Sequence, residues 1–439
     1  MSRRLAFAAA AVLFLGITPA IAGEPCRDCV RAGAARVRLR VPAGTPLAGY
    51  GSWARRLLVP DLLARHPHAF WFKPHEGELD PLFARALVVE RGDQRLVWVG
   101  ADLIAVDRDF TRLVARGLAG HGVAAGHLVL SASHTHSGPG AFLHSGVFGV
   151  ISAEREDPAV RDVLVSGLVE AARRAAGSLV DARTGVGAGA APALTRGRLG
   201  LPVDSEIIVV KVVAASGAPV ALLWNYAIHG TMLGPRNLML SGDVMGLAAR
   251  ELERQLGVPA LFVNGAVGDV SPERHGRGEA VETAGRLAAG VRAVWDRVPA
   301  TAPATVRIMT RAVELPAPHL SVKNCVGRWI PAALGVPLGR VLPRDTELTA
   351  GLLGHAAWVT IPGELQSRLG ETIKRAGAPP GGRAFVAGLS NEYLGYFLAP
   401  ADYSRPSYVA CASFYGPTAG EYLAGVAIDL LAALGRGER

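Results

Sequence analysis

The chain alternates between segments with a helical spacing of apolar residues and short runs with the composition of β-strands. Apolar residues recur at three- and four-residue spacing in several segments, which predicts amphipathic helices at Phe110 to Leu118, Val160 to Leu179, Val244 to Leu256, Val281 to Val298 and Gly420 to Leu434. Apolar or β-branched runs between them predict strands at Leu96 to Val99, Leu128 to Leu130, Ile207 to Val213, Pro219 to Trp224, Leu261 to Val263, Ala357 to Ile361 and Ala384 to Ala387. Strands that alternate with helices favour an α/β fold, with a layered mixed β-sheet core flanked by helices.

Two long segments interrupt this alternation. Ser52 to Leu79 is rich in arginine, histidine, proline and aromatic residues, and Leu315 to Leu348 is proline-rich and apolar without a clear period. Long irregular segments of this kind are either functional lids and binding loops or mobile connections, and the sequence leaves both open. No fixed repeat or low-complexity linker separates two large domains, so we expect residues 23–439 to form a single domain.

The composition is that of a large folded protein. Half of the 439 residues are hydrophobic, 19% are charged and four are cysteines, which excludes a disordered chain and a disulfide-held scaffold. The net charge is +9, from 46 Lys and Arg against 37 Asp and Glu. The cations are scattered, so the sequence does not predict a nucleic-acid partner. The charge suits solubility or weak attraction to an anionic membrane surface, as in a peripheral membrane contact.

The amino terminus has the pattern of a secretory signal peptide. Arg3 and Arg4 precede an apolar run from Leu5 to Ile17, and a small-residue cleavage site ends at Ala22. No later segment offers the roughly 18 apolar residues that a membrane span requires. We therefore expect residues 1–22 to be removed and the mature protein to be exported, either periplasmic or secreted.

The four cysteines form no zinc-knuckle pattern. Cys26 and Cys29 make a C-x-x-C pair near the expected mature start, while Cys325 and Cys411 lie far downstream without a second close Cys or His pair. In an oxidising compartment this pattern favours a local disulfide between Cys26 and Cys29 over inert thiols and over a redox or metal role.

Two histidines follow a predicted strand. The segment from Leu128 to Gly140 leads into His134-Thr-His136-Ser-Gly-Pro-Gly, and an extended backbone would place both imidazoles on one face. This spacing suits a zinc site in which one histidine is a ligand and the other lies beside it. The alternative is a pair of hydrogen-bonded polar residues at the end of a strand.

Three further predicted strands end in chemically capable side chains. His229 follows the first, Asp269 and Ser271 follow the second, and Glu364 follows the third. Ligands of open α/β sheets bind outside the carboxyl ends of the strands, so these side chains would form one site if the ends converge. Two histidines and a carboxylate form a known catalytic zinc set. Taken singly, each residue has a simpler explanation, such as a helix N-terminal charge for Glu364.

Several other catalytic motifs are absent from the sequence. It contains no H-E-x-x-H, G-x-S-x-G or Walker pattern, which counts against zincin proteases, ordinary serine esterases and nucleotide enzymes. The glycines from Gly185 to Gly189 superficially suggest a dinucleotide-binding loop. Because Pro192 and a polar stretch follow where a helix should begin, we expect a flexible connection there instead.

The ordered motifs resemble those of the neutral/alkaline non-lysosomal ceramidases. The resemblance covers roughly Leu47 to Leu434 and rests on these blocks: His134-Thr-His136-Ser-Gly-Pro-Gly, His229-Gly-Thr-Met, Ser241-Gly-Asp243, Gly268-Asp-Val-Ser271-Pro, Pro362-Gly-Glu364, Asn391-x-Tyr393-x-x-Tyr396 and Ser413-x-Tyr415-Gly-Pro417. Members of this family are zinc amidases that cleave the N-acyl bond of ceramide to give sphingosine and a fatty acid. The resemblance therefore implies a lipid-like amide substrate.

The resemblance also implies roles for individual residues. Four side chains would bind Zn²⁺, namely His134, His229, Glu364 and Tyr396. Three others would line the reacting centre without binding the metal, namely His136, Ser271 and Tyr408. A substrate-site arginine of the family matches the stretch from Thr195 to Arg198, where Arg196 is favoured over Arg198. Gly49 resembles a glycine that lines the pocket.

This arrangement allows two mechanisms. Zinc lowers the pKa of bound water from about 15.7 to about 7 and polarises the amide carbonyl. His136, Tyr408 and the arginine would then stabilise an oxyanion or protonate the departing amine. Ser271 could instead attack the carbonyl as a nucleophile activated by His136. A metal with its own hydroxide makes a serine nucleophile unnecessary, so the sequence favours Ser271 as a hydrogen-bonding residue.

The sequence departs from the family pattern on the substrate side. Val409 follows Tyr408 where the family usually has Glu, and the chain stops at Arg439, before the C-terminal immunoglobulin-like domain of full-length members. We expect a zinc-dependent amidase of ceramide or a related N-acyl lipid, with no obligate protein partner. The alternatives are a catalytically inactive lipid-binding protein, and a zinc hydrolase of other amides or esters with a shallow polar pocket.

Overall fold

A mixed eight-stranded sheet forms the larger layer of the computed structural model, which describes residue 26 and residues 28–119 and 128–437. The order of its strands is β11-β9-β8-β6-β1-β3-β4-β5. The pairs β4·β5 and β9·β11 are parallel and the other pairs are antiparallel. The strands are β1 (Val30–Arg38), β3 (Phe83–Arg91), β4 (Gln94–Ala101), β5 (Leu128–Ala132), β6 (Val180–Ala190), β8 (Glu206–Ala214), β9 (Pro219–Tyr226) and β11 (Ala260–Asn264).

A smaller sheet packs against the large one. Its order is β13 (Val306–Glu314), β16 (Asp345–Leu353), β17 (Ala356–Thr360) and β19 (Arg383–Ala387). Trp98 of the large sheet contacts Trp358 and Phe385 of the small one, with ring centroids 4.8 and 5.9 Å apart. Buried aromatic contacts of this kind supply much of the apolar area that holds two layers together.

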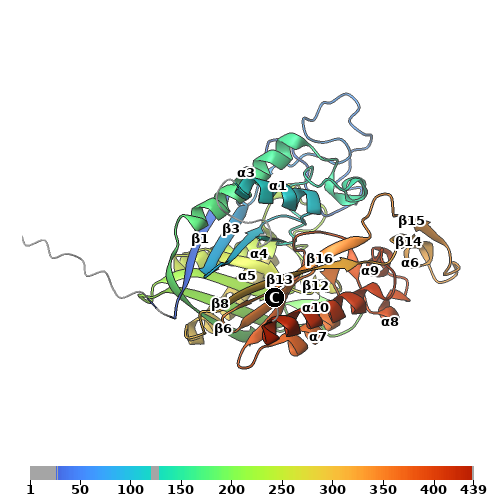
Figure 1. Cartoon of the computed structure of the whole chain (residues 1–439). Coiled ribbons are helices and arrows are strands. Elements are labelled where there is room, and N and C mark those ends of the chain that lie inside the picture. Colours follow the sequence, from blue (N-terminus) through green and yellow to red (C-terminus); the bar gives the residue numbers. More distant parts are fainter. Residues whose placement is uncertain (1–25, 27, 120–127, 438–439) are drawn as a thin grey trace, which may run out of the picture.

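Helices cover the outer faces of both sheets. On the large sheet lie α1 (Arg108–Ala119), α3 (Pro158–Ala176), α4 (Asp243–Leu256) and α5 (Arg277–Arg297), and on the small sheet lie α7 (Ser367–Gly377) and α10 (Ala419–Arg436). Figure 1 shows α1 and α3 on the side of the molecule opposite α7 and α10. The result is a four-layer arrangement of helices, sheet, sheet and helices, which confirms the predicted α/β class.

The remaining elements are short. The two-stranded pairs are β2 (Gly77–Glu78) with β10 (Met239–Leu240), β7 (Thr195–Gly197) with β12 (Val270–Pro272), β14 (His319–Ser321) with β15 (Gly335–Pro337), and β18 (Glu364–Leu365) with β20 (Tyr396–Phe397). The short helices are α2 (Gly146–Phe148), the π-helical turn η2 (Gly149–Ala153), α6 (Val322–Val326), α8 (Pro400–Tyr403) and α9 (Tyr408–Cys411).

The large sheet curves until its two edges approach each other. Gly100 of β4 lies so close to β11 that a Cβ atom there would be 3.1 Å from the carbonyl oxygen of Phe262. The side chain of Asn264, at the end of β11, donates to the carbonyl of Ser133, just after β5 (Nδ2–O 3.0 Å). The curvature therefore brings together the carboxyl ends of strands that lie at opposite edges of the sheet.

The predicted elements agree with the structure except at the glycine-rich segment. All five predicted helices and all seven predicted strands are present, with ends that shift by a few residues. The expected flexible connection from Gly185 to Gly189 is wrong, because this segment belongs to β6. Gly187 allows α5 to pack on the strand, since a Cβ there would be 2.2 Å from a methyl of Val298.

The structure can be compared with three further expectations, on the signal peptide, on membrane spans and on the cysteines. The expected signal peptide, residues 1–22, lies outside the described residues. None of the described helices is long and apolar enough to cross a bilayer. Cys26 and Cys29 form the expected disulfide, and Cys325 and Cys411 form a second one, which was not predicted from the sequence.

A buried ionic network joins the large sheet to α4. Arg85 of β3 donates to Asp102 (Nη1–Oδ2 3.1 Å) and to Glu253 (Nε–Oε1 2.8 Å), and all three side chains are almost fully buried. Asp102 also accepts the backbone N–H of Phe83 (2.9 Å). Removing one partner from such a network leaves charges without compensation in a dry interior, which costs far more than losing an exposed ion pair.

We expect the substitution Arg85→Met to lower the free energy of unfolding by about 3–5 kcal/mol, because it leaves the buried Asp102 without a cationic partner and Glu253 with only the half-exposed Arg36. The matched control is Arg254→Met, which removes an exposed pair with Glu251 on the same helix and should cost about 1 kcal/mol or less. Urea unfolding of both variants measures the difference. Equal losses would contradict the structural role of Arg85.

Candidate metal centre

Three buried histidines meet where the edges of the large sheet converge. His134 and His136 follow β5, and His229 follows β9. Their metal-binding nitrogens all lie within 4.8 Å of one another. Gly230 holds the two segments in register, since its N–H donates to the carbonyl of His134 (3.2 Å) and its carbonyl accepts the N–H of His136 (2.8 Å). The backbone therefore sets the spacing of the imidazoles.

His134 has the geometry of a metal ligand with a fixed tautomer. Its backbone does not keep the extended geometry expected from the sequence, because φ is +72°, in the left-handed region. Such strain in a residue other than glycine is typical of functional sites. Its Nδ1 lies 2.7 Å from the carbonyl oxygen of Ile104, which accepts the ring proton. That bond leaves the lone pair of Nε2 free to bind a cation.

His229 faces the carboxylate of Glu364. Its Nε2 lies 3.0 Å from Oε2 of Glu364, and His134 Nε2 lies 3.3 Å from Oε1 of the same carboxylate. Among the described residues, His134 Nε2, both ring nitrogens of His229 and Glu364 Oε2 have no hydrogen-bond partner. Buried polar atoms without partners cost free energy, so these side chains have the character of a set of metal ligands.

The electrostatics of the centre favour the protonation states that a metal needs. Burial, followed by the charge of Arg198, lowers the pKa of His229 to about 3. Burial also lowers the pKa of His136 well below its usual value. Burial opposes ionisation of Glu364, but His134 and His229 outweigh it and hold the pKa of that carboxyl well below its usual range. Neutral imidazoles beside a carboxylate are the forms that bind metal ions.

Two tyrosines of the Asn-x-Tyr-x-x-Tyr block contact this group. Tyr396 lies opposite Glu364 in the β18·β20 pair, and burial followed by the charge of Glu364 raises the pKa of its phenol well above the usual value. Tyr393 donates its hydroxyl proton to Oε1 of Glu364 (2.7 Å). Tyr393 has no role predicted from the sequence, although it belongs to the block that carries Tyr396.

The structure places Arg198, and not the favoured Arg196, beside the predicted site residues. Arg198 donates to Oγ of Ser271 (Nε–Oγ 2.8 Å) and to the hydroxyl of Tyr396 (Nη1–OH 3.2 Å). Arg196 is exposed on β7, where it pairs with Ser271 through the backbone. The preference for Arg196 is thus corrected, because the side chain that turns inward is the one that follows the short strand.

Asp269 does not face the histidines. Its Oδ1 accepts the N–H of Ser367 at the start of α7 (2.8 Å), and its carbonyl accepts the N–H of Arg198 (2.7 Å). Asp269 therefore positions the segment that carries Arg198. No hydrogen bond joins Ser271 to His136 in the part of the chain that the structure describes.

A cavity of about 40 Å³ opens beside the histidines. Its wall includes apolar residues and predicted site residues, among them Gly49, Leu143, Phe148, Tyr396 and Tyr408. Because about 10–15 Å³ of such space holds one water, the cavity has room for a small reacting group but not for an enclosed acyl chain. The chain of a lipid substrate would have to lie along the rim.

Gly49 and Tyr408 border this cavity in different ways. Gly49 has φ of +101°, and a Cβ there would lie 2.6 Å from the ring of His136, so only glycine fits against that imidazole. Tyr408 begins α9 at the mouth of the cavity, where its side chain is 70% exposed and its ring centroid lies 5.9 Å from that of Tyr396.

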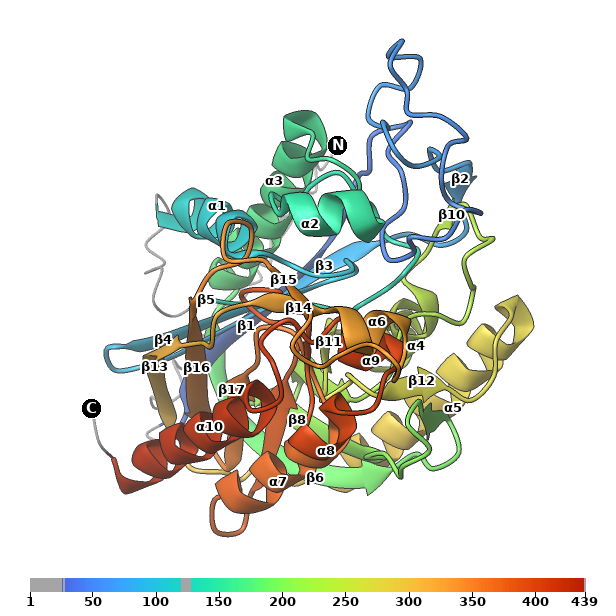
Figure 2. The same cartoon turned by 90° about the vertical axis from the view of Figure 1, so that its right-hand side faces the viewer.

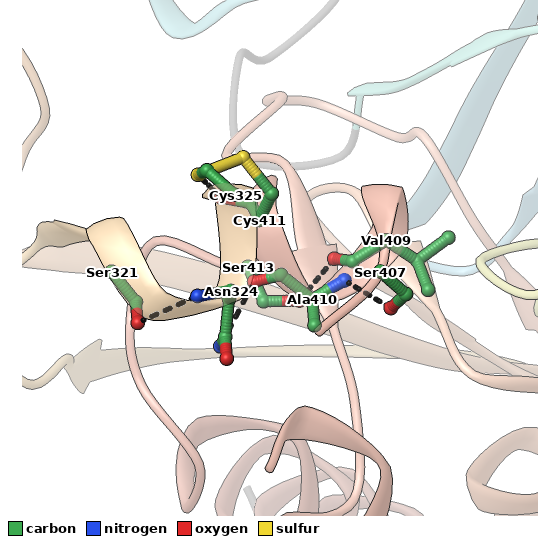
Figure 3. Close-up of a disulfide and its surroundings, with 8 residues drawn as sticks. All are labelled: Ser321, Asn324, Cys325, Ser407, Val409, Ala410, Cys411 and Ser413. Carbon is green, nitrogen blue, oxygen red and sulfur yellow. Dashed lines mark hydrogen bonds between the residues drawn. A yellow bond between two sulfur atoms is a disulfide. The ribbon is translucent and has the colours of Figure 1, made fainter. Parts of the chain in front are cut away.

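A disulfide fixes α9 to the irregular segment Leu315 to Leu348. Figure 3 shows Cys411, the last residue of α9, bonded to Cys325 of α6. Asn324 also donates to the carbonyl of Ala410 (3.5 Å). The position of Tyr408 therefore depends on a segment that the sequence pattern could not interpret.

The fold and the cluster define an α/β protein with a buried site that could hold a metal ion. The family model described as neutral/alkaline non-lysosomal ceramidase, N-terminal, matches residues 74–286. The chain is similar to this family over those residues, which confirms the resemblance drawn from its motifs.

Individual relatives agree with this assignment. The neutral ceramidase of Pseudomonas aeruginosa is 27% identical over 212 residues, or 43% of this chain and 32% of the relative. A neutral ceramidase of Oryza sativa subsp. japonica is 30% identical over 199 residues, or 40% of this chain and 25% of the relative. The matched regions thus span a third or less of these curated relatives.

The fold matches that of a solved ceramidase. The crystal structure of neutral ceramidase from Pseudomonas aeruginosa has a TM-score of 0.79 and 19% identity, over 93% of this chain and 75% of that chain. A structure described as ceramidase complexed with C2 has a TM-score of 0.78 and 18% identity, over 93% of this chain and 76% of that chain. At this level of identity the match shows the fold.

We expect Gly49→Ala to destabilise the protein more than a change at a comparable backbone position, because its methyl would meet His136. The matched control is Gly217→Ala, where φ is +91° and no atom lies within 4 Å of the added Cβ. The left-handed backbone should cost the control about 1–2 kcal/mol, and overpacking should cost Gly49→Ala about 1–3 kcal/mol more. Denaturant unfolding of both variants tests this, and equal losses would show that His136 gives way freely.

Proposed function

We propose that the protein is a zinc-dependent amidase that hydrolyses the N-acyl bond of ceramide or a related N-acyl lipid and releases a fatty acid. The observation that carries this proposal is the group of buried, unpartnered ligand atoms on His134, His229 and Glu364. The matches to neutral ceramidases support the substrate class. Nitrogen and carboxylate ligands of this kind suit a catalytic Zn²⁺ ion.

The donor set fits zinc with Tyr396 as the fourth ligand. Bound zinc would satisfy His134 Nε2, one ring nitrogen of His229 and the carboxylate of Glu364. Tyr393 would hold that carboxylate in place through its 2.7 Å hydrogen bond. When bound, zinc polarises a substrate carbonyl and lowers the pKa of a water at the site to about 7.

The other residues would handle charge and protons. Neither ring nitrogen of His136 has a hydrogen-bond partner among the described residues, so this side chain is free to exchange a proton with water and with the departing amine. Arg198 places a partly buried positive charge beside Tyr396, where it would stabilise a developing oxyanion. Tyr408 would contact the substrate at the mouth of the cavity.

Ser271 would act as a hydrogen-bonding residue. A serine nucleophile needs a base within hydrogen-bond reach, whereas Oγ of Ser271 accepts from the guanidinium of Arg198. An arginine in that position orients the serine but does not remove its proton, because its own pKa is too high. This contact supports the hydroxide mechanism over attack by serine.

A second candidate function is the hydrolysis of smaller amides or esters by the same centre. The size of the cavity favours it, because about 40 Å³ would admit a short acyl group more easily than a long chain. The two functions differ in substrate and share the same metal ligands.

We also propose that residues 23–439 form one exported catalytic domain. The amino-terminal pattern supports export, and the pairing of both sets of cysteines suits an oxidising compartment.

We expect the purified protein to bind about one Zn²⁺ ion and to hydrolyse short- and long-chain ceramides in detergent, with activity lost on chelation and restored by zinc. His229→Ala should lose the metal and lower kcat/KM by about 10³-fold or more, since the metal contributes several kcal/mol. The control His144→Ala removes an exposed histidine paired with Glu156 and should change neither. Metal analysis and product assays measure both effects.

Three outcomes separate the hypotheses for this centre. Turnover of simple esters or short amides without turnover of any ceramide would favour the second candidate function. Metal binding without hydrolysis of any amide or ester would contradict the hypothesis that the protein is an enzyme. Sphingolipid binding that persists in His229→Ala would then identify an inactive lipid-binding protein.

We expect Ser271→Ala to retain measurable hydrolysis, because it removes one hydrogen bond to a charged partner, worth about 1.5–3 kcal/mol or about 10- to 100-fold in kcat/KM. Arg198→Met should cause a similar or larger loss, since it removes the charge as well. Rapid quenching and mass spectrometry of the parent enzyme provide the decisive control. An acyl group on Ser271 would overturn the hydroxide mechanism.

A further inference from the structure

A loop near the candidate site exposes an unusual number of large apolar side chains. Within residues 53–63 the exposed fractions run from 71% to 103% for Trp53, Leu58, Val59, Leu62 and Leu63. We refer to these residues as the apolar loop. Figures 1 and 2 show the blue segment that contains it projecting away from the layers of the fold. Clustered exposed apolar residues of this kind mark an interaction site.

The base of the apolar loop is firmly held. One oxygen of the buried Glu154 carboxylate accepts the N–H groups of Phe70, Trp71 and Phe72 at 3.0, 2.8 and 2.9 Å. Arg56 donates to the carbonyl of Val150 (2.6 Å). These bonds fix the loop on the neighbouring η2 segment, so its apolar tip stays presented to the surroundings.

A second apolar edge lies on the same side of the molecule. In the segment Val326 to Val341, which we call the second edge, several side chains are about half exposed or more: Val326, Trp329, Leu334, Val336 and Val341. In Figure 1 the blue segment with the apolar loop projects at the upper right, and the second edge, with β15, projects at the right. The Cys325–Cys411 disulfide connects the second edge to α9, which carries Tyr408.

Residues next to both edges line the cavity. Gly49, just before the apolar loop, lines the cavity, as do Ser152 and Ala153, just after the half-exposed Val150 and Ile151. Tyr408 lines it from the side of the second edge. A surface that contacted both edges would therefore face the entrance to the candidate metal centre.

The charges at both edges suit an anionic surface. The second edge contains Arg328 and Arg340 and no acidic residue. Beside the apolar loop, Arg65 and Arg155 are exposed. The one acid of the loop, Asp61, accepts a hydrogen bond from the backbone N–H of His66 (2.6 Å). Apolar tips with tryptophan, flanked by arginines, are the composition that binds the interface of anionic bilayers.

We propose that the apolar loop and the second edge form a docking surface for the interface of an anionic phospholipid bilayer. Leu58 and Leu62 enter the boundary between headgroups and acyl chains, and Trp53 and Trp329 lie at headgroup level. The exposed arginines contact lipid phosphates. For its benefit to catalysis this inference rests on the proposed function, because it would bring a lipid chain to the rim of a cavity too small to enclose it.

The surface fits a bilayer better than a second copy of the chain. The apolar side chains stand on two separate projecting tips, whereas an interface between two copies needs a continuous, closely packed area of about 800 Å² on each partner. A fluid interface can accept both tips at once without matching their shape.

The test is binding of the mature protein to vesicles, measured by flotation and independently of hydrolysis. We expect binding to vesicles of phosphatidylcholine with phosphatidylserine, weaker binding to phosphatidylcholine alone, and a decrease with salt. The double variant Leu58→Ser/Leu62→Ser should weaken binding by about 10²-fold, because two exposed leucines no longer enter the lipid. The control Val163→Ser/Val281→Ser changes exposed valines on α3 and α5 and should bind normally.

The charge contribution is tested separately. Arg328→Gln/Arg340→Gln should reduce binding to the anionic vesicles by about 5-fold for each arginine and should reduce the salt dependence. Binding to phosphatidylcholine alone should change little, because the apolar tips are intact.

Three results would overturn the docking surface. The first is wild-type protein that binds neither vesicle, whether or not it hydrolyses amides. The second is loss of turnover of a short-chain substrate in detergent by Leu58→Ser/Leu62→Ser, which would place these leucines in the active site. The third is a wild-type dimer that the same variant converts to a monomer. Vesicle binding without any hydrolysis would support the surface and contradict only the proposed function.

Discussion

The side chain of Asn264 joins the two edges of the large sheet. It donates to the carbonyls of Ser133, just after β5, and of Ile228, just after β9, at 3.0 and 2.9 Å. Its own oxygen accepts the N–H groups of Ile228 and Gly265. Because His134 and His229 are the next residues along those two segments, one fully buried amide sets the distance between two candidate ligands. Buried hydrogen-bond networks of this completeness specify a single arrangement.

Hydrogen bonds hold the segments around the candidate metal centre, but several of its own ligand atoms have no hydrogen-bond partner. The segments are held by backbone bonds, by Asn264 and by the carbonyl of Ile104. The unpartnered atoms belong to His134, His229 and Glu364 and are counted among the described residues. Burying polar atoms without partners costs free energy that the rest of the fold must supply. A bound cation would remove that cost, so metal binding and stability are expected to be coupled in this protein.

The sequence predicted the layers well because apolar periodicity reports burial directly. It identified the strands that lead to His134 and His229, and motif order indicated the family. It could not choose between Arg196 and Arg198, because that choice depends on where the two-stranded β7·β12 pair ends. The predicted flexible connection around Gly187 was wrong, because a glycine that allows a helix to pack on a strand cannot be told from a flexible one by sequence. Contacts such as Tyr393 with Glu364 required the folded geometry.

The Cys325–Cys411 bond has a consequence for the entrance to the centre. It spans 86 residues and acts as a strut between the proline-rich segment and the short helix that begins at Tyr408. Such a strut forms only where thiols oxidise. One side of the entrance to the centre therefore depends on the redox state of its surroundings, because under reducing conditions α9 would lack its covalent link to α6.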